Sequence, residues 1–96
     1  SSRNTLLDAA HRAAAPHIYA TLHAAVSKSQ EMTPAQLKAW VTAEVERNPL
    51  LKVIYYQSVD ARTMQEVATW DDSPRIQGCI AVQAGDIRLI DNICIR

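Results

Sequence analysis

The stretch QGCIAVQAGDIRLIDNICI, from Gln77 to Ile95, decides the fold of this chain. Gly85 and Asp86 lie between two apolar runs, and a two-residue turn with glycine in its first central position is typical of a type II′ β-hairpin. The turn places Ala84 opposite Ile87, and directly opposed residues share one face. That face collects seven apolar side chains, which we expect to lie against the core: Ile76, Ile80, Val82, Ile87, Leu89, Ile93 and Ile95.

The other face of the predicted hairpin is polar and carries Gln77, Gln83, Arg88, Asn92 and Arg96. Asp91 interrupts the apolar face, because the register places it opposite Ile80. A carboxylate in that position needs either hydrogen-bond donors or a rim that water reaches. We expect Asp91 to be largely buried and to accept hydrogen bonds.

The length and composition predict a single soluble domain. The chain has 96 residues, with ten basic and ten acidic side chains, and no segment concentrates lysine or arginine. Binding to nucleic acid or to an anionic membrane therefore has no electrostatic support. No apolar run approaches the ~20 residues of a membrane span, and the first residues show no signal or transit pattern. We expect a cytoplasmic protein.

The cysteines and histidines do not indicate a disulfide or a metal site. Cys79 and Cys94 fall on the polar hairpin face as diagonal neighbours, about 7–8 Å apart, which is slightly long for a bridge. His11, His17 and His23 recur every six residues, so a helix would turn successive rings by about 120°. We expect two free thiols and no protein metal ligands.

The residues before the hairpin predict two helical regions and a strand. Asp8 is a candidate N-cap of a first helix. Pro16 indicates a kink or a break at Ala15. Residues 18–27 are expected to form an amphipathic helix, in which Tyr19 widens the apolar stripe. The series Thr33-Pro34-Ala35-Gln36 starts a further helix, which ends before Asn48-Pro49. Leu51 to Val59 is expected to be a strand, and Asp60 to cap a short helical turn reaching Val67.

The predicted order is helix, helix, strand, short helix, strand, strand. We therefore expect an α+β fold, in which a small three-stranded, mostly antiparallel sheet has helices packed on one face.

The first four residues, SSRN, leave two interpretations open. The hydroxyls of Ser1 and Ser2 and the guanidinium of Arg3 are groups that can surround a phosphate. A polar chain end without a role is the alternative.

Four segments together resemble the carboxy-terminal domain of the pantothenate synthetase (pantoate–β-alanine ligase) family. They are SSRN at 1–4, RAAAPHIYATL at 12–22, VIYYQSVDARTM at 53–64 and AGDIRLIDNI at 84–93, in the order of the family. The resemblance implies a ligase in which ATP and pantoate give pantoyl adenylate and pyrophosphate, and the amine of β-alanine then attacks the adenylate. Residues 1–96 would be the single lid domain of that enzyme.

The resemblance also implies the site residues and the partners. Ser1, Ser2 and Arg3 would bind the phosphates of ATP, with Arg3 also catalytic, and Mg²⁺ would be bound through those phosphates. The family's larger amino-terminal nucleotide-binding domain, with its HIGH-type motif, has no counterpart in the chain, which we expect to be an excised domain or fragment that is inactive alone. A homodimer is the assembly implied for the full-length enzyme.

A different class of function remains open beside the ligase. The chain would then be a free-standing interaction or oligomerisation module, with the edge strand from Leu51 to Val59 or the apolar hairpin face joining a partner.

Overall fold

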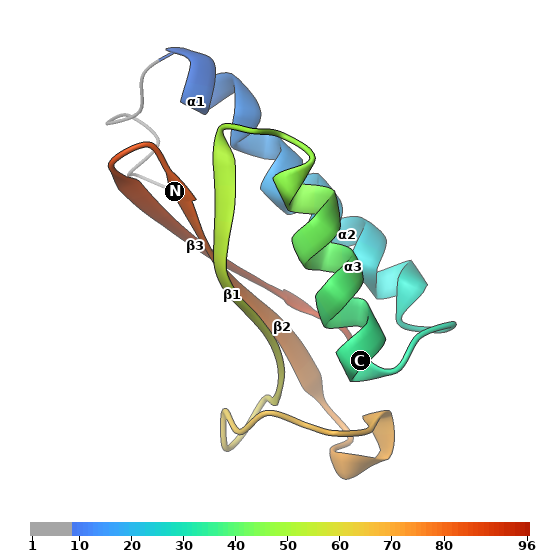
Figure 1. The fold of residues 1–96 in the computed structure, drawn as a ribbon. Coiled ribbons are helices and arrows are strands. Elements are labelled where there is room, and N and C mark those ends of the chain that lie inside the picture. The colour runs from blue at the N-terminus through green and yellow to red at the C-terminus, as the bar shows by residue number, and fades with distance from the viewer. Residues whose placement is uncertain (1–8) are drawn as a thin grey trace.

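The computed structural model describes residues 9–96, so the expected cap at Asp8 lies outside the described part. Figure 1 shows helices on one side of a three-stranded antiparallel sheet. In chain order the elements are α1 (Ala9–Ala14), α2 (Pro16–Lys28), α3 (Pro34–Glu46), β1 (Leu51–Asp60), the 3₁₀ turn η2 (Trp70–Asp72), β2 (Ile76–Ala84) and β3 (Ile87–Cys94). The predicted α+β class is confirmed.

The predicted hairpin register is confirmed. Strands β2 and β3 pair with Ala84 opposite Ile87 and Ile80 opposite Asp91. Gly85 has a φ of +63°, and Asp86 is not in the left-handed region, which is the pattern of a type II′ turn. β1 pairs antiparallel with β2, so β2 is the central strand and β1 and β3 are the edges.

Proline separates the first two helices, as the sequence predicts. α1 ends at Ala14 and α2 starts at Pro16, because proline has no N–H for the ladder and its ring clashes with the preceding turn. α2 buries Ile18, Leu22 and Ala25. The prediction for Tyr19 is wrong: its side chain is 52% exposed, since it lies beyond the stripe that faces the sheet.

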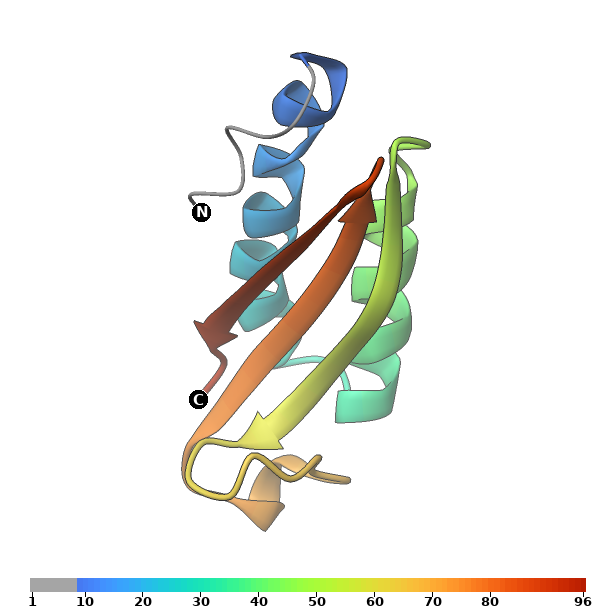
Figure 2. The ribbon, with the colours of Figure 1, turned by 90° about the vertical axis from the view of Figure 1, so that its left-hand side faces the viewer.

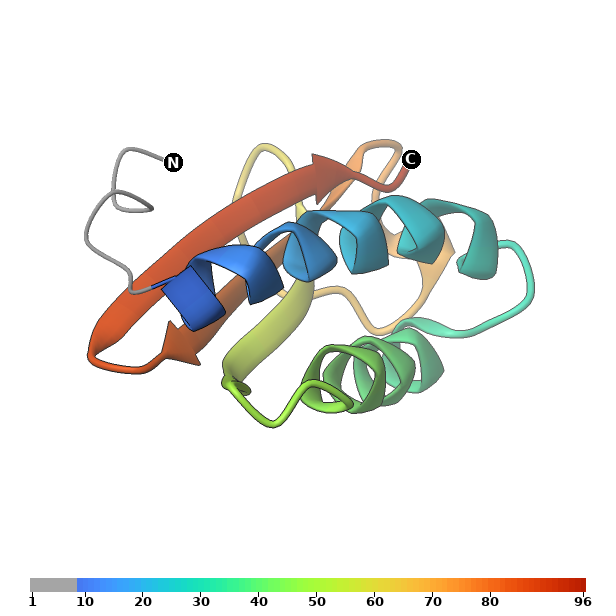
Figure 3. The same ribbon diagram turned by 90° about the horizontal axis from the view of Figure 1, so that it is seen from above.

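The start of α3 has the predicted capping box. The amide of Gln36 donates to Thr33 Oγ1 at 3.2 Å, and the amide of Thr33 donates to Gln36 Oε1 at 3.0 Å. Its inner face carries Leu37, Val41 and Val45, all fully buried. Seen from above, α2 follows β3 while α3 lies beside β1 (Figure 3).

The core lies between these two helices and the inner face of the sheet. Tyr56 is its largest fully buried side chain, and its hydroxyl lies 3.3 Å from Ser58 Oγ. The ring occupies the space that a side chain at Gly78 would need: a Cβ there would be 2.6 Å from Tyr56 Oη. Glycine in the middle of β2 is therefore required by close approach.

The predicted helical turn after Asp60 is confirmed at its cap, but the turn ends well before Val67. Asp60 Oδ1 accepts the amides of Arg62 and Thr63 at 2.7 and 3.1 Å, and Val67 N donates to Ser58 O at 2.9 Å. The chain thus folds back onto β1 through a turn, with Met64 at a φ of +61°. The short helical element lies later, at η2.

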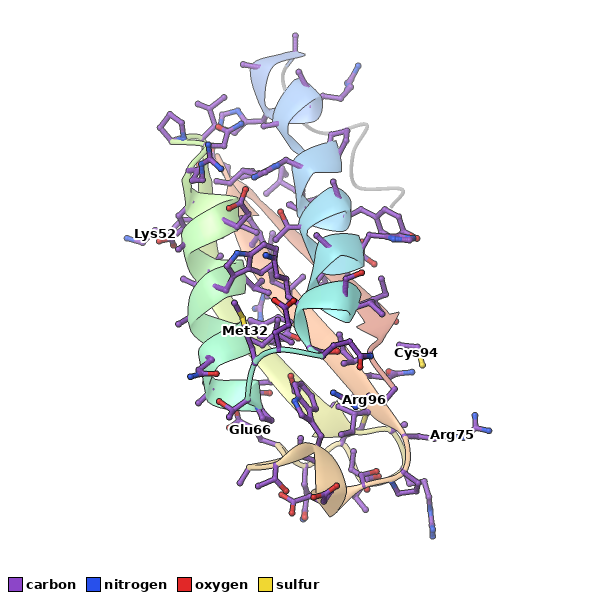
Figure 4. All side chains as sticks on the ribbon, turned by 90° about the vertical axis from the view of Figure 1, so that its right-hand side faces the viewer. Met32, Lys52, Glu66, Arg75, Cys94 and Arg96 are labelled. Carbon is purple, nitrogen blue, oxygen red and sulfur yellow. The ribbon has the colours of Figure 1, made fainter. Side chains whose placement is uncertain are left out.

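Two expectations for the hairpin are corrected. Asp91 is only half-buried, at the rim of a groove between α2 and β3, and accepts the neighbouring amide of Asn92 at 2.8 Å. Arg96 leaves the polar face, because the amides of Ile95 and Arg96 both donate to Ile76 O and the strand alternation ends. The Arg96 side chain lies beside the α2–α3 connection that carries Met32 (Figure 4).

Candidate functional site

Ser1, Ser2 and Arg3, the residues assigned to phosphate binding, lie outside the described residues. The described chain starts at Ala9, at the upper end of the domain in Figure 1. The β2–β3 turn and the connection from α3 to β1 lie at the same end. The surfaces at this end are described first.

The β2–β3 turn packs directly against α1. A Cβ at Gly85 would be 3.2 Å from Cε1 and Nε2 of the His11 ring, and the turn is braced by Gln83 Nε2, which donates to Gly85 O at 2.6 Å. Six residues form no stable helix alone, so α1 depends on such tertiary contacts. The turn therefore helps to hold α1 in place.

The helix-free face of the sheet carries a row of polar residues close to this turn. Lys52 pairs with Gln83, and Gln83 pairs with Arg88, so the three lie side by side across the strands. They point away from the core, because their neighbours Leu51, Val82 and Leu89 are buried. Figure 2 shows this face toward the viewer, with the helices behind it.

Lys52 and Arg88 are unpaired cations among the described residues, since neither side chain has a hydrogen bond or an ion pair there. Both are exposed. The sequence indicated the face of Arg88 through the hairpin register. The sequence did not predict that Lys52 lies in the same row as Arg88, because no short turn sets the pairing of β1 with β2.

The thiols and histidines do not form a reactive site in the described part. Cys79 and Cys94 are free, as predicted, and burial raises the pKa of the Cys79 thiol, so it is a poor nucleophile at neutral pH. His17 Nε2 lies 2.8 Å from the carbonyl of Glu44. No three histidine, cysteine or acidic side chains between residues 9 and 96 gather as metal ligands.

The opposite end of the domain is held together by local polar contacts. Trp70 Nε1 donates to Met32 O at 2.7 Å, and the Arg96 guanidinium lies 4.9 Å from the centre of the Trp70 ring. Arg96 also donates to Ser29 O at 2.8 Å. These contacts join the β1–β2 loop, the chain from β3 and the α2–α3 connection.

Asp72 organises η2 through three hydrogen bonds. Its carboxylate accepts the amide of Thr69 at 3.1 Å, the amide of Ala68 at 2.8 Å and the hydroxyl of Thr69 at 3.1 Å. The Thr69 amide, followed by the Ala68 amide and the Thr69 hydroxyl, lowers the pKa of Asp72 below its usual value. The charged form is therefore favoured by folding.

Asp72→Asn is expected to lower the thermal midpoint at neutral pH, because an amide accepts these bonds less well than a carboxylate. A lowered folded pKa gives stability that is complete above the unfolded pKa and is lost as the pH falls through the folded value. The difference between wild type and variant should therefore shrink below about pH 4. Thermal unfolding between pH 7 and pH 3 measures this difference in midpoint, and the neighbouring Asp71→Asn variant is the control. A difference that does not change with pH would contradict the stabilising role of the Asp72 carboxylate.

The fold and the basic sheet face define a small α+β domain, and comparison with known proteins places it in a family. The family model of pantoate-beta-alanine ligase matches residues 1–94. The chain belongs to the pantoate-beta-alanine ligase family. No helix between residues 9 and 96 is long and apolar enough to cross a bilayer.

Individual relatives agree with the family match. The pantothenate synthetases of Porphyromonas gingivalis and Bacteroides thetaiotaomicron are each 39% identical over 93 residues, which is 97% of this chain and 33% of theirs. The crystal structure of pantothenate synthetase from Thermus thermophilus superposes with a TM-score of 0.85 at 26% identity, covering 99% of this chain and 34% of that one. The chain thus spans about a third of the relatives it matches.

Proposed function

We propose that this chain is the carboxy-terminal lid domain of an ATP-dependent ligase that joins pantoate to β-alanine through pantoyl adenylate. The observation that carries the proposal is the family match over residues 1–94, together with relatives named pantothenate synthetase of which the chain spans a third. The partners are then ATP, pantoate, β-alanine and the nucleotide-binding domain of the same polypeptide. A homodimeric, cytoplasmic enzyme fits this role.

In this proposal Ser1, Ser2 and Arg3 contact the phosphates of ATP, and Mg²⁺ is held by those phosphates. Charge develops on the pyrophosphate oxygens as the adenylate forms. A fixed guanidinium with two hydroxyls would stabilise that charge more in the transition state than in the ground state. Arg3 is the residue we propose as catalytic.

The domain would also exclude water from the reaction. Pantoyl adenylate is an acyl phosphate, which water can hydrolyse before the amine of β-alanine arrives. A closing domain suppresses that side reaction. In the described part of the chain the hollows are open surface grooves, such as the one between α2 and β3, which suits a domain that completes a site formed elsewhere.

The isolated 96-residue chain is expected to form no AMP from ATP and pantoate, because the pockets for the substrates would lie in the other domain. Release of labelled AMP measures this directly. The positive control is the same chain mixed with, or fused to, the amino-terminal domain of a relative. Turnover by the isolated chain would contradict the lid role, and so would a fusion that folds but stays inactive.

An interaction module is the second candidate, and one observation favours it. Among the described residues, no strand pairs with the outer edge of β3, and the loop after β1 pairs only with the end of β1 near Val59. Ile54 on β1 and Ile90 on β3 are 46% and 57% exposed. Such edges can add a strand from a partner. A stable dimer of the isolated chain by sedimentation, without restoration of ligase activity by the added domain, would favour the module.

A further inference from the structure

The two faces of the sheet differ in what covers them. α2 and α3 pack on the inner face, whereas no described helix covers the outer face (Figure 2). At the end far from the β2–β3 turn the outer face is buried, where Val59 is 2% exposed beside the loop that pairs with it. Below the row of Lys52, Gln83 and Arg88 on the outer face, the register aligns Tyr55, Ala81 and Ile90. The outer face thus has an apolar centre and a basic end.

The apolar centre is unusual for a surface that only meets solvent. Ala81 is fully buried beneath its neighbours although it lies on the outer face, and Ile90 and the nearby Ile54 are about half exposed. Adjoining apolar side chains with polar groups at their border are typical of a surface that a partner covers.

The basic end suits a polyanion. Lys52 and Arg88 lie on strands that flank β2, so their backbones are about 10 Å apart at the usual strand spacing. Both side chains are long, and Lys52 extends away from the helices in Figure 4. Gln83 between them is already bonded to the turn, so the two cations are the groups free to meet phosphate oxygens.

We propose that the helix-free face of the sheet is the surface that closes on the adenylation site, with Lys52 and Arg88 contacting the triphosphate of ATP. The inference rests on the proposed function, and its occupant is the nucleotide-bearing domain of the same polypeptide. Two observations point to that occupant: the chain spans a third of its relatives, and the basic end lies at the same end of the domain as Ala9. The charge of ATP complements the two cations.

Lysine footprinting in a full-length enzyme tests which face closes. The chain has three lysines: Lys28 and Lys38 on the helices, and Lys52 on the open face. Lys38 is paired with Glu66 at 3.3 Å but stays half exposed, and Lys28 lies 5.7 Å from the Trp40 ring centre, so both serve as internal controls. Acetylation is followed by mass spectrometry with and without pantoate, Mg²⁺ and a non-hydrolysable ATP analogue.

We expect these ligands to slow acetylation of Lys52 about tenfold or more, and to leave Lys28 and Lys38 unchanged. Protection of Lys28 or Lys38 in place of Lys52 would show that the helical face closes on the site. The lid function would then stand, but the assignment of the helix-free face would be overturned. Equal labelling of all three lysines with and without ligands, in an active enzyme, would overturn the lid itself and this inference with it.

Kinetics provide the second test. Lys52→Ala and Arg88→Ala should each lower kcat/KM for ATP about 10- to 100-fold, the loss typical of one charge-assisted contact. Arg88→Lys should recover part of it, and the loss should fall at high ionic strength. Arg62→Ala, in the loop at the other end of the domain, is the matched control. Full activity of both variants, with thermal midpoints unchanged, would overturn the contact.

Discussion

Arg3→Ala in a full-length ligase that carries this domain is expected to lower the rate of pantoyl adenylate formation roughly 30- to 1000-fold. This corresponds to the loss of one charge-assisted contact of about 2–4 kcal/mol in the transition state. Arginine is permanently charged and binds phosphate through a planar fork, and its contact strengthens as charge grows on the leaving pyrophosphate. The adenylation rate should therefore fall more than ATP affinity does.

Rapid-quench measurement of the first half-reaction separates this effect from loss of structure. Arg3→Lys should recover only part of the rate, because ammonium keeps the charge but not the fork. The thermal midpoint should stay within about two degrees, as for an ordinary surface change. An unchanged first-step rate, or a collapse of stability in place of the rate, would show that the phosphate role does not belong to Arg3.

Gly78→Ala is expected to destabilise the domain by about 1–3 kcal/mol, the usual cost of overpacking a core. The added methyl would lie 2.6 Å from the hydroxyl of Tyr56 and 3.2 Å from two of its ring atoms. Tyr56 is 1% exposed and bonded to Ser58, so the ring has little freedom to yield. Strand propensity alone predicts the opposite sign, since glycine weakens a strand.

A double-mutant cycle with Tyr56→Phe tests the cause. Removing the hydroxyl takes away the closest atom but leaves the ring, so Gly78→Ala should cost less in the Tyr56→Phe background. Gln77→Ala, one position earlier on the other face, is the control. Chemical unfolding measures all of them, and an equal cost of Gly78→Ala in both backgrounds would show that Tyr56 is not the obstacle.

The sequence by itself determined the features that depend on neighbours along the chain. The glycine of the β2–β3 turn sets a register that matches the structure pair by pair. Pro16 separates α1 from α2, and the series from Thr33 to Gln36 starts α3, because missing N–H groups and caps act within four residues. The family resemblance was readable for the same reason, since its motifs are short continuous segments.

Local patterns misplaced the residues whose environment comes from elsewhere in the chain. Asp60 caps one turn as its sequence predicts, but the pairing of the following loop with β1 ends that turn before Val67. The inward and outward alternation of side chains along β3 predicts that Arg96 lies on the polar face. In the fold its guanidinium instead donates to the carbonyl of Ser29, 67 positions earlier in the chain. Asp91 lies at the rim because the groove between α2 and β3 remains open beside it.

Only the tertiary structure decided how β1 joins the hairpin, and with it two features that matter for function and stability. Pairing of β1 with β2 brings Lys52 into one row with Arg88, and it places the Tyr56 ring over Gly78. A 15-residue connection between β1 and β2, including η2, sets no register by itself. The pairing is fixed by burial of Leu51 and Tyr56 against the helices, which depends on residues distant in sequence.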